Sequence, residues 1–149
     1  MRTPGLFSCE TEIEVPFNDL DPLEIVWHGN YLRYYEIARC HLLRLIDYDY
    51  PTMRESGYAW PIVECQLKYV AAARFAQHLK ITTTVLEYEH RLKIAYRTID
   101  AETGVLINKA VTTQVAVEMA SGEMQFVSPP ALTERITRYL ASQGTSSVS

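Results

Sequence analysis

The chain has 149 residues, 48% of them hydrophobic and 21% charged, and these values are typical of an ordinary globular domain. The formal net charge is −4 and no basic stripe is present, which argues against a nucleic-acid-binding protein. No stretch approaches the roughly 20 consecutive apolar residues of a membrane-spanning helix. The three cysteines are widely spaced and suggest neither a zinc site nor a redox pair. We therefore expect a cytoplasmic protein that needs no metal and no organic cofactor.

The first predicted element is a strand over residues 10–17, where Ile13, Val15 and Phe17 alternate with polar residues. Turn-forming residues follow at 18–22. The strongest predicted helix covers residues 31–46, because apolar side chains recur there at helical spacing. Asn30 is the expected N-cap of this helix. Residues 47–57 are predicted to be a connection.

From residue 58 onward the hydrophobic period changes to two, which predicts four strands at residues 60–70, 79–89, 92–100 and 105–119. A short strand at 123–127 and a helix at 132–140 follow, and residues 142–149 are expected to form a polar, disordered tail. One strand, one long helix and then a run of strands predict an α+β domain with an antiparallel sheet.

The domain is expected to span residues 1–149, with its core at about 9–140. The long helix must lie across the sheet in order to bury its apolar face. The other face of the sheet, or its edge, is then left for a partner. This favours a homo-oligomer, either a two-fold dimer or a tetramer built from such dimers.

The segment from Phe17 to Arg39 contains the residues best suited to chemistry. Asp19 and Asp21 stand just before a proline and shortly ahead of the predicted helix. A helix N-terminus has free N–H groups at the positive end of its dipole, and such groups suit an oxyanion hole. A nearby aspartate suits a nucleophile or general base. Because a thiol has a pKa of about 8.5, a thioester could be cleaved here without a strong acid. Taken alone, the pattern is more often that of a cap and a turn than of a catalytic site.

The run Asp-Leu-Asp-Pro at 19–22, followed by Ile-Val-Trp-His-Gly-Asn-Tyr at 25–31, closely resembles the signature of 4-hydroxybenzoyl-CoA thioesterases and of the related acyl-CoA thioesterases of Tol–Pal gene clusters. The resemblance is most specific over residues 17–39 and extends more loosely to about residue 127. It implies the hotdog fold, in which an antiparallel sheet of about five strands wraps a long central helix. It also implies hydrolysis of acyl-CoA, aromatic or hydroxyaroyl-CoA included, to the free acid and CoA.

By this resemblance Asp21 is the catalytic carboxylate and the backbone N–H of His28 binds the thioester oxygen. The His28 side chain remains an alternative base, because a free imidazole titrates near 6.5. Four residues would support or line the substrate site: Asp19, Trp27, Asn30 and Tyr31. One departure stands out, because relatives often have a small residue or glycine where this chain has Leu23 and Glu24. The bulky pair is expected to alter the loop or the acyl pocket.

Four charged residues outside this segment are weaker candidates for the substrate site. Glu64 is a reserve carboxylate on the polar face of its predicted strand. Arg74, Arg91 and Lys93 are candidates for the CoA phosphates, although each also fits a solvated surface charge. Two other functions remain open: a thioesterase acting on an acyl-carrier protein in a polyketide-like pathway, and an acyl-CoA-binding module without catalysis. A basic patch near the pocket mouth would favour the carrier-protein substrate, since carrier proteins are acidic.

Overall fold

The computed structural model describes the backbone of residues 5–148 and the side chains of residues 5–143. In chain order the elements are β1 (Phe7–Glu14), η1 (Phe17–Asp19), α1 (Asn30–Leu45), α2 (Tyr50–Glu55), β2 (Tyr58–Ala59), β3 (Ile62–Tyr69), β4 (His78–Glu87), β5 (Leu92–Asp100), β6 (Leu106–Gln114), β7 (Val117–Glu118) and α3 (Pro130–Val148). No helix in this part of the chain is long and apolar enough to cross a membrane.

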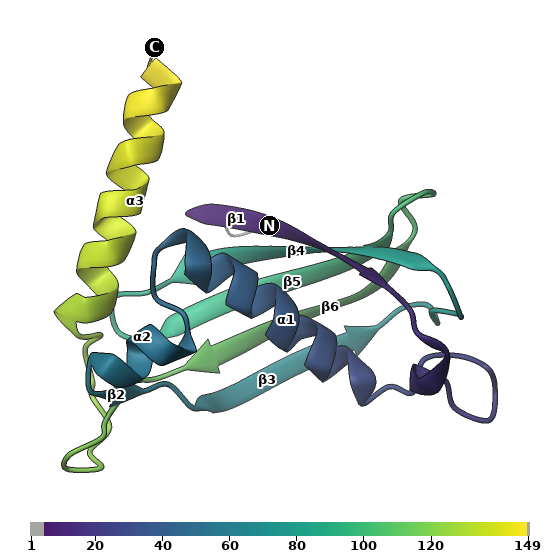
Figure 1. Ribbon diagram of the computed structural model, residues 1–149, viewed down its shortest axis with the longest axis horizontal. Helices are drawn as coiled ribbons and strands as arrows, with labels where there is room; N and C mark the ends of the chain where they lie inside the picture. The colour runs from purple at the N-terminus through teal and green to yellow at the C-terminus, as the bar shows by residue number, and fades with distance from the viewer. Residues whose placement is uncertain (1–4, 149) are drawn as a thin grey trace.

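Five of the strands form one antiparallel sheet in the order β1-β4-β5-β6-β3 (Figure 1). The consecutive strands β4, β5 and β6 occupy its centre, and β1 and β3 are its two edges. The short strands β2 and β7 pair separately. This arrangement confirms the predicted α+β class with a largely consecutive antiparallel sheet.

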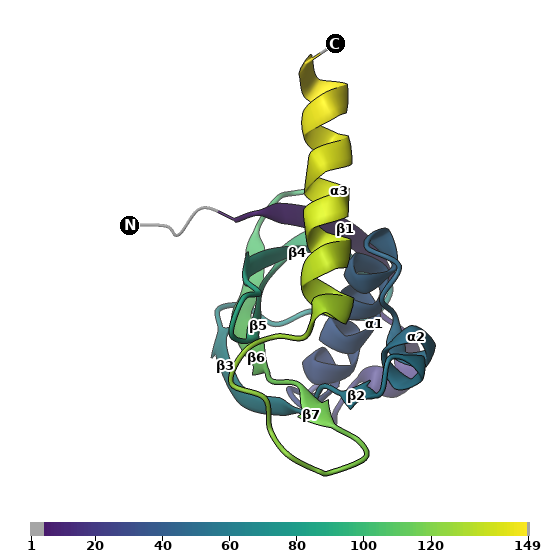
Figure 2. The ribbon, with the colours of Figure 1, turned by 90° about the vertical axis from the view of Figure 1, so that its left-hand side faces the viewer.

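Helix α1 crosses one face of the sheet and buries a continuous stripe against it (Figures 1 and 2). The stripe comprises Tyr31, Tyr34, Tyr35, Ala38, Arg39, Leu42 and Leu43. It packs on inward-facing side chains of the central strands, among them Leu79, Ile81, Val85, Leu92 and Ile94, which share one core cluster with it. Figure 2 shows α1 and α2 on the same side of the sheet. A long helix held in a curved five-stranded sheet is the hotdog arrangement that the sequence predicted.

Several elements differ from the prediction. Residues 47–57, which were predicted to be a connection, contain the short helix α2. Pro51 lies in the first turn of this helix, where a missing backbone N–H removes no helical hydrogen bond. The predicted strand at 123–127 is only an isolated bridge between Met124 and Val117. Helix α3 continues to Val148, so the polar tail expected at 142–149 is helical over its described part. Tertiary packing of Leu132 and Ile136, both buried, anchors the first turns of this helix.

Strand β3 also departs from expectation. Seven of its eight residues are exposed, and only Leu67 is half-buried. The thiol of Cys65 is exposed, although Cys65 alternates with the apolar residues Val63 and Leu67 at the two-residue period. The reason is that β3 is an edge strand, paired with β6 on one side only, so the described chain covers little of either face.

Candidate active site

The loop between β1 and α1 is fastened to the helix by Asp19. The Asp19 carboxylate accepts a hydrogen bond of 2.6 Å from the hydroxyl of Tyr34 and forms an ion pair with the guanidinium of Arg33. Its backbone oxygen accepts from the amide of Trp27 at 3.0 Å and from the side chain of Asn30 at 3.0 Å. Burial alone would raise the pKa of Asp19, but the hydrogen bonds from Arg33 and Tyr34 outweigh it and lower the pKa below its usual value. Asp19 is therefore an ionised anchor for the loop.

Asp21 lies at the start of a tight turn. Its Oδ1 accepts a hydrogen bond of 2.8 Å from the amide of Leu23, the bond that defines an Asx turn. Its backbone N–H donates to the carbonyl of Ile25 at 2.8 Å, and its carbonyl accepts from Glu24 at 2.9 Å. The second carboxylate oxygen, Oδ2, has no hydrogen-bond partner among the described residues. One oxygen thus fixes the side chain in the turn, and the other is left for a substrate or a water molecule.

The residues just before α1 present two unused donors. Within the described chain, the backbone N–H groups of His28 and Gly29 have no hydrogen-bond acceptor, whereas the N–H of Asn30 donates to the carbonyl of Trp27 at 2.9 Å. These groups stand at the positive end of the α1 dipole. A Cβ at Gly29 would lie 2.2 Å from the ring of Trp27, so the close approach of this ring requires glycine.

The predicted N-cap was wrong by one position. The N-cap of α1 is Gly29, with no side-chain capping bond, and Asn30 is the first helical residue. The Asn30 amide reaches back to the Asp19 carbonyl instead of capping the helix. It therefore ties the helix start to the aspartate loop, a bond between residues 11 positions apart that local capping rules cannot anticipate.

A cavity of about 280 Å³ opens beside this helix start. It is lined by Ile25, Val26, His28, Tyr31, Tyr69, Val70, Ala71 and Ala72. Most of these side chains are apolar, and the polar groups come from His28 and from two tyrosines. Asp21 does not line the cavity, but Ile25, whose carbonyl holds the Asp21 amide, does. The cavity thus joins an apolar space to the turn that carries Asp21.

Tyr31 and Trp27 have different environments. Tyr31 is buried, lines the cavity, and accepts a hydrogen bond of 3.2 Å at its hydroxyl from the amide of Ala73. The Trp27 side chain is half exposed, and its ring lies 5.1 Å from the imidazole of His28. Tyr31 is therefore a fixed wall of the cavity, whereas Trp27 packs beside His28 outside the cavity lining.

The departure at Leu23 and Glu24 has a structural consequence. Glu24 has a φ of 64°, in the left-handed region where glycine is favoured. The Leu23 side chain is 76% exposed and contributes nothing to the cavity lining. The turn is thus made here with a glutamate in a strained backbone conformation. The bulky pair points to solvent in the single chain.

The remaining candidates are scattered. Arg74 is exposed and close to the loop, since its backbone bridges to Ile25. Arg91 forms an ion pair of 3.2 Å with Glu87 in the β4–β5 turn, and Lys93 follows on β5. This turn lies at the end of the sheet opposite to the aspartate loop. Glu64 lies on β3 beside Thr113 of β6 and does not line the cavity.

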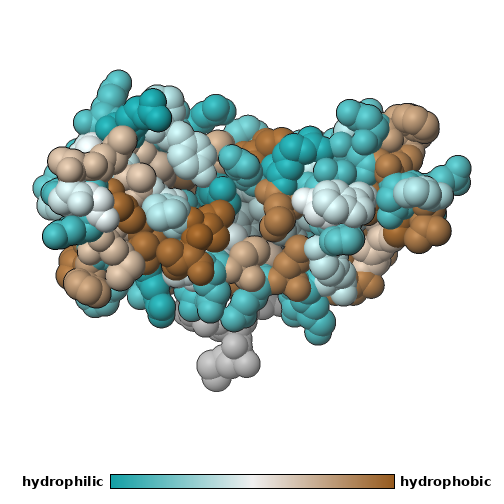
Figure 3. All heavy atoms as spheres, turned by 90° about the horizontal axis from the view of Figure 1, so that it is seen from below, coloured by the Kyte–Doolittle hydropathy of each residue, from teal (hydrophilic) through white to brown (hydrophobic). Residues whose placement is uncertain are grey.

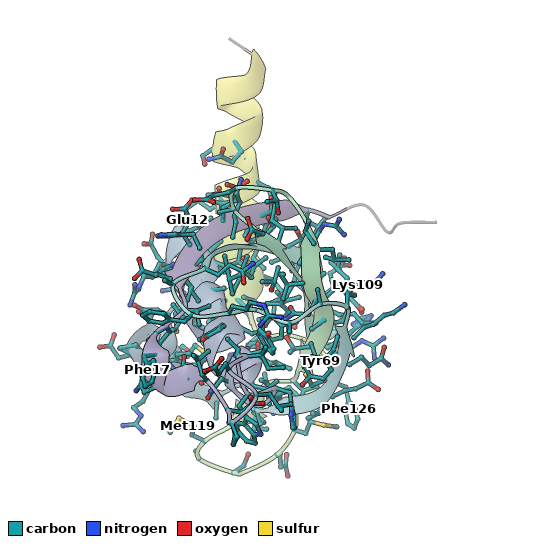
Figure 4. The ribbon with its side chains drawn as sticks, turned by 90° about the vertical axis from the view of Figure 1, so that its right-hand side faces the viewer. Glu12, Phe17, Tyr69, Lys109, Met119 and Phe126 are labelled. Carbon is teal, nitrogen blue, oxygen red and sulfur yellow. The ribbon has the colours of Figure 1, made fainter. Side chains whose placement is uncertain are left out.

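Three residues of the site were missed from the sequence. Arg33 and Tyr34 bind Asp19 from the first turns of α1, and Tyr69 donates a hydrogen bond of 3.1 Å from its hydroxyl to the carbonyl of His28. Figure 4 labels Tyr69, which comes from the end of β3. The helical spacing of Tyr34 suggested only core packing. The contact of Tyr69 joins residues 41 positions apart, which no local pattern reveals.

Comparison with known proteins agrees with this fold and identifies the family. The sequence model of the Thioesterase-like superfamily matches residues 15–137. The Synechocystis protein sll0410 is 31% identical over 115 residues, which cover 76% of this chain and 69% of that protein. The Escherichia coli acyl-CoA thioester hydrolase YbgC is 27% identical over 107 residues, covering 71% of this chain and 79% of the hydrolase.

Solved structures show the same architecture. The 1,4-dihydroxy-2-naphthoyl-CoA thioesterase from Synechocystis superposes with a TM-score of 0.79 at 20% identity, covering 88% of this chain and 96% of that one. A 4-hydroxybenzoyl-CoA thioesterase gives a TM-score of 0.76 at 22% identity, covering 87% and 98%, and is an aspartate-to-asparagine mutant in complex with 4-hydroxybenzoyl-CoA. The fold and the site define a hotdog-fold protein of the thioester-hydrolase type. The chain belongs to the Thioesterase-like superfamily, as its signature at residues 17–39 predicted.

Proposed function

We propose that this protein is an acyl-CoA thioesterase that hydrolyses acyl-CoA to the free acid and CoA. The observation that carries the proposal is that one loop before α1 holds both the partly free carboxylate of Asp21 and the unused N–H groups of His28 and Gly29, and lines an apolar cavity through Ile25 and His28. The relatives named as acyl-CoA thioester hydrolases support the same substrate class.

In the proposed reaction the thioester carbonyl lies at the N-terminus of α1, with its oxygen toward the N–H groups of His28 and Gly29. Negative charge develops on this oxygen as the carbonyl carbon is attacked, and preorganised donors stabilise it. Asp21 either attacks the carbon itself, giving an acyl-enzyme anhydride that water then hydrolyses, or removes a proton from an attacking water molecule. In both routes the C–S bond breaks, CoA leaves as a thiolate, and the acyl group leaves as a carboxylate.

Asp21 is the better candidate of the two loop aspartates. The Asp19 carboxylate is buried and engaged by Arg33 and Tyr34, so neither of its oxygens is available to a substrate. Asp21 is partly exposed and keeps Oδ2 unbound within the described chain. The related thioesterase captured with its substrate as an aspartate-to-asparagine mutant supports a carboxylate in this role.

The proposed active form is a homodimer that pairs the β3 edges of two copies. Ile62 and Val63 are 44% and 57% exposed on this edge, and apolar side chains gather on the face that it borders (Figure 3). An antiparallel pairing of β3 with its two-fold copy would cover these residues and satisfy the free backbone groups of the edge. It would also bring the far end of each sheet, with Arg91 and Lys93, beside the aspartate loop of the partner. These two cations then become candidates for the CoA phosphates.

The test is thiol release from a panel of short, long and aromatic acyl-CoAs. We expect turnover of at least one of them, and the best substrate then fixes the acyl preference. Ala71→Phe should fill the cavity and sharply reduce turnover, whereas the matched Ala59→Phe on β2 should not, because both alanines are exposed and only Ala71 lines the cavity. Binding of acyl-CoA without any cleavage would instead establish a binding module.

A second candidate substrate, an acyl group on a carrier protein, is favoured by a specific observation. Three adjacent cations, Lys68, Lys109 and Arg97, lie on the open face of the sheet, and the row begins next to Tyr69 of the cavity. Arg91 and Lys93, the candidates for the CoA phosphates, are not part of this row.

A further inference from the structure

The outer face of the sheet, the one turned away from α1, carries a row of cations. In the strand register Lys68 of β3 is paired with Lys109 of β6, and Lys109 is paired with Arg97 of β5. All three side chains are exposed. Figure 4 shows Lys109 pointing away from the helices on this side of the sheet. Neighbouring strands lie about 4.8 Å apart, so the row places three positive charges within roughly 10 Å.

No interaction within the described chain compensates the charges of this row. Like charges directly opposite each other on a sheet are destabilising. Across the described chain, no carboxylate forms an ion pair with any of the three cations. The nearest acidic residue in the same row is Glu10, which is separated from Arg97 by Thr82 and lies 3.8 Å from Lys80. On a chain with a net charge of −4, an uncompensated positive row indicates a ligand of opposite charge.

The shape around the row fits a convex partner better than a small molecule. The cations border an open hollow of about 900 Å³ whose lining includes the short side chains of Thr82, Thr84, Ala95 and Val111. The hollow does not enclose a ligand, and exposed lysines alone hold a free anion weakly. Side chains three or four positions apart on a helix surface are about 5–6 Å apart, close to the strand spacing. An acidic helix laid across the row could therefore oppose one carboxylate to each cation.

The row also leads to the proposed active site. Lys68 precedes Tyr69, and successive residues of a strand point to opposite faces. The Lys68 side chain therefore lies on the outer face, while Tyr69 lines the cavity and contacts the carbonyl of His28. A group attached to a partner on the outer face would reach the cavity by passing around the end of β3.

We propose that the outer face of the sheet, along Lys68, Lys109 and Arg97, is the docking surface for an acidic carrier protein that presents its acyl group on a phosphopantetheine thioester. The proposal rests on the proposed thioesterase function and adds the partner and its binding surface. A second copy of this chain is a poorer occupant, because two copies of a positive row repel each other across a two-fold axis.

The test uses Lys109→Glu, with Arg54→Glu as its control. Lys109→Glu places a carboxylate between two cations, so the variant should fold at least as stably as the parent chain. Arg54→Glu changes the charge by the same amount on α2, where Arg54 is exposed and makes no ion pair within the described chain. Binding of the Escherichia coli acyl carrier protein is measured by calorimetry at low salt. Thiol release is measured from the octanoyl carrier protein, from octanoyl-CoA and from octanoyl-pantetheine.

We expect Lys109→Glu to weaken carrier binding and to lower kcat/KM on the octanoyl carrier protein by roughly tenfold or more, with a reduced salt dependence. Turnover of octanoyl-pantetheine should not change, and Arg54→Glu should behave like the parent chain. Equal carrier binding by Lys109→Glu and the parent chain, or no carrier binding at all, overturns the docking proposal. Weaker binding of free CoA with unchanged carrier binding also overturns it, because the row would then serve nucleotide phosphates. Carrier binding that Lys109→Glu abolishes, without cleavage of any thioester, supports the docking surface and contradicts only the proposed function.

Discussion

The hydroxyl of Tyr34, on the second turn of α1, donates a hydrogen bond of 2.6 Å to the carboxylate of Asp19 in the preceding loop. Both side chains are buried, whereas Arg33, the second partner of Asp19, has a side chain that is 51% exposed. The buried bond is therefore the main fastening between the loop and the helix. Because Asp21 and the helix start both depend on this loop, the Asp19–Tyr34 pair positions the proposed catalytic groups.

Asp19→Asn should lower the free energy of unfolding at neutral pH by about 2 kcal/mol, because hydrogen bonds to a buried charge are lost. The pKa of Asp19 is lowered in the folded chain, so this stabilisation is present above the unfolded-state pKa of about 4 and is lost as the pH falls through the folded-state value. Urea unfolding of the parent chain and the variant at pH 7 and at pH 3 measures the difference. If the difference in unfolding free energy between the parent chain and the variant were the same at pH 3 as at pH 7, the Asp19 charge would not fasten the loop.

Tyr69→Phe should reduce kcat about threefold to tenfold, because it removes the hydrogen bond to the His28 carbonyl and loosens the proposed oxyanion donors. Its effect on stability should be small, since Tyr69 is half exposed. Steady-state kinetics on the best acyl-CoA, with Tyr58→Phe on β2 as the control, measures this change. Equal kcat values for Tyr69→Phe and Tyr58→Phe would mean that Tyr69 does not support the proposed oxyanion donors.

Glu24→Gly should raise the free energy of unfolding by about 0.5 kcal/mol. Glycine relieves a left-handed conformation that costs a side-chain-bearing residue about 1 kcal/mol, and its greater freedom in the unfolded state offsets part of that gain. Glu24→Ala keeps the positive φ and should show no comparable gain. Thermal unfolding of the two variants provides the comparison. If Glu24→Ala were more stable than Glu24→Gly, the turn would not be strained.

Val63→Lys should convert the proposed dimer into a monomer, because a charged side chain would enter the β3 edge. Val105→Lys is the matched control, since Val105 is comparably exposed (54% against 57%) and belongs to the β5–β6 connection instead of β3. Sedimentation measures the mass of each variant. A Val63→Lys protein that remains a dimer would move the interface to another surface.

The sequence predicted the fold class and the position of the loop because both depend on local patterns. The two-residue period at 92–100 marked β5 correctly, and the helical period marked α1 to within one residue at each end. The signature at residues 17–39 located the aspartate loop and the helix start. These signals require only neighbouring residues in the chain.

The remaining features depend on contacts between distant segments. The exposure of Cys65 follows from the edge position of β3, which only the strand order reveals. The cation row combines single residues from three strands and shows no cluster in the sequence. The helical extension of α3 to Val148 overrode a polar composition that had favoured disorder.

The role of Asp21 is the central claim, and replacement of Asp21 by asparagine tests it most directly. The asparagine can keep the Asx-turn hydrogen bond to Leu23 while losing the charge needed for attack or for proton removal. We predict that Asp21→Asn still binds the best acyl-CoA with nearly unchanged affinity, whereas single-turnover thiol release falls by about a thousandfold or more. Thiol release at the parent rate by a folded Asp21→Asn protein would contradict the account and move catalysis to His28 or Glu64.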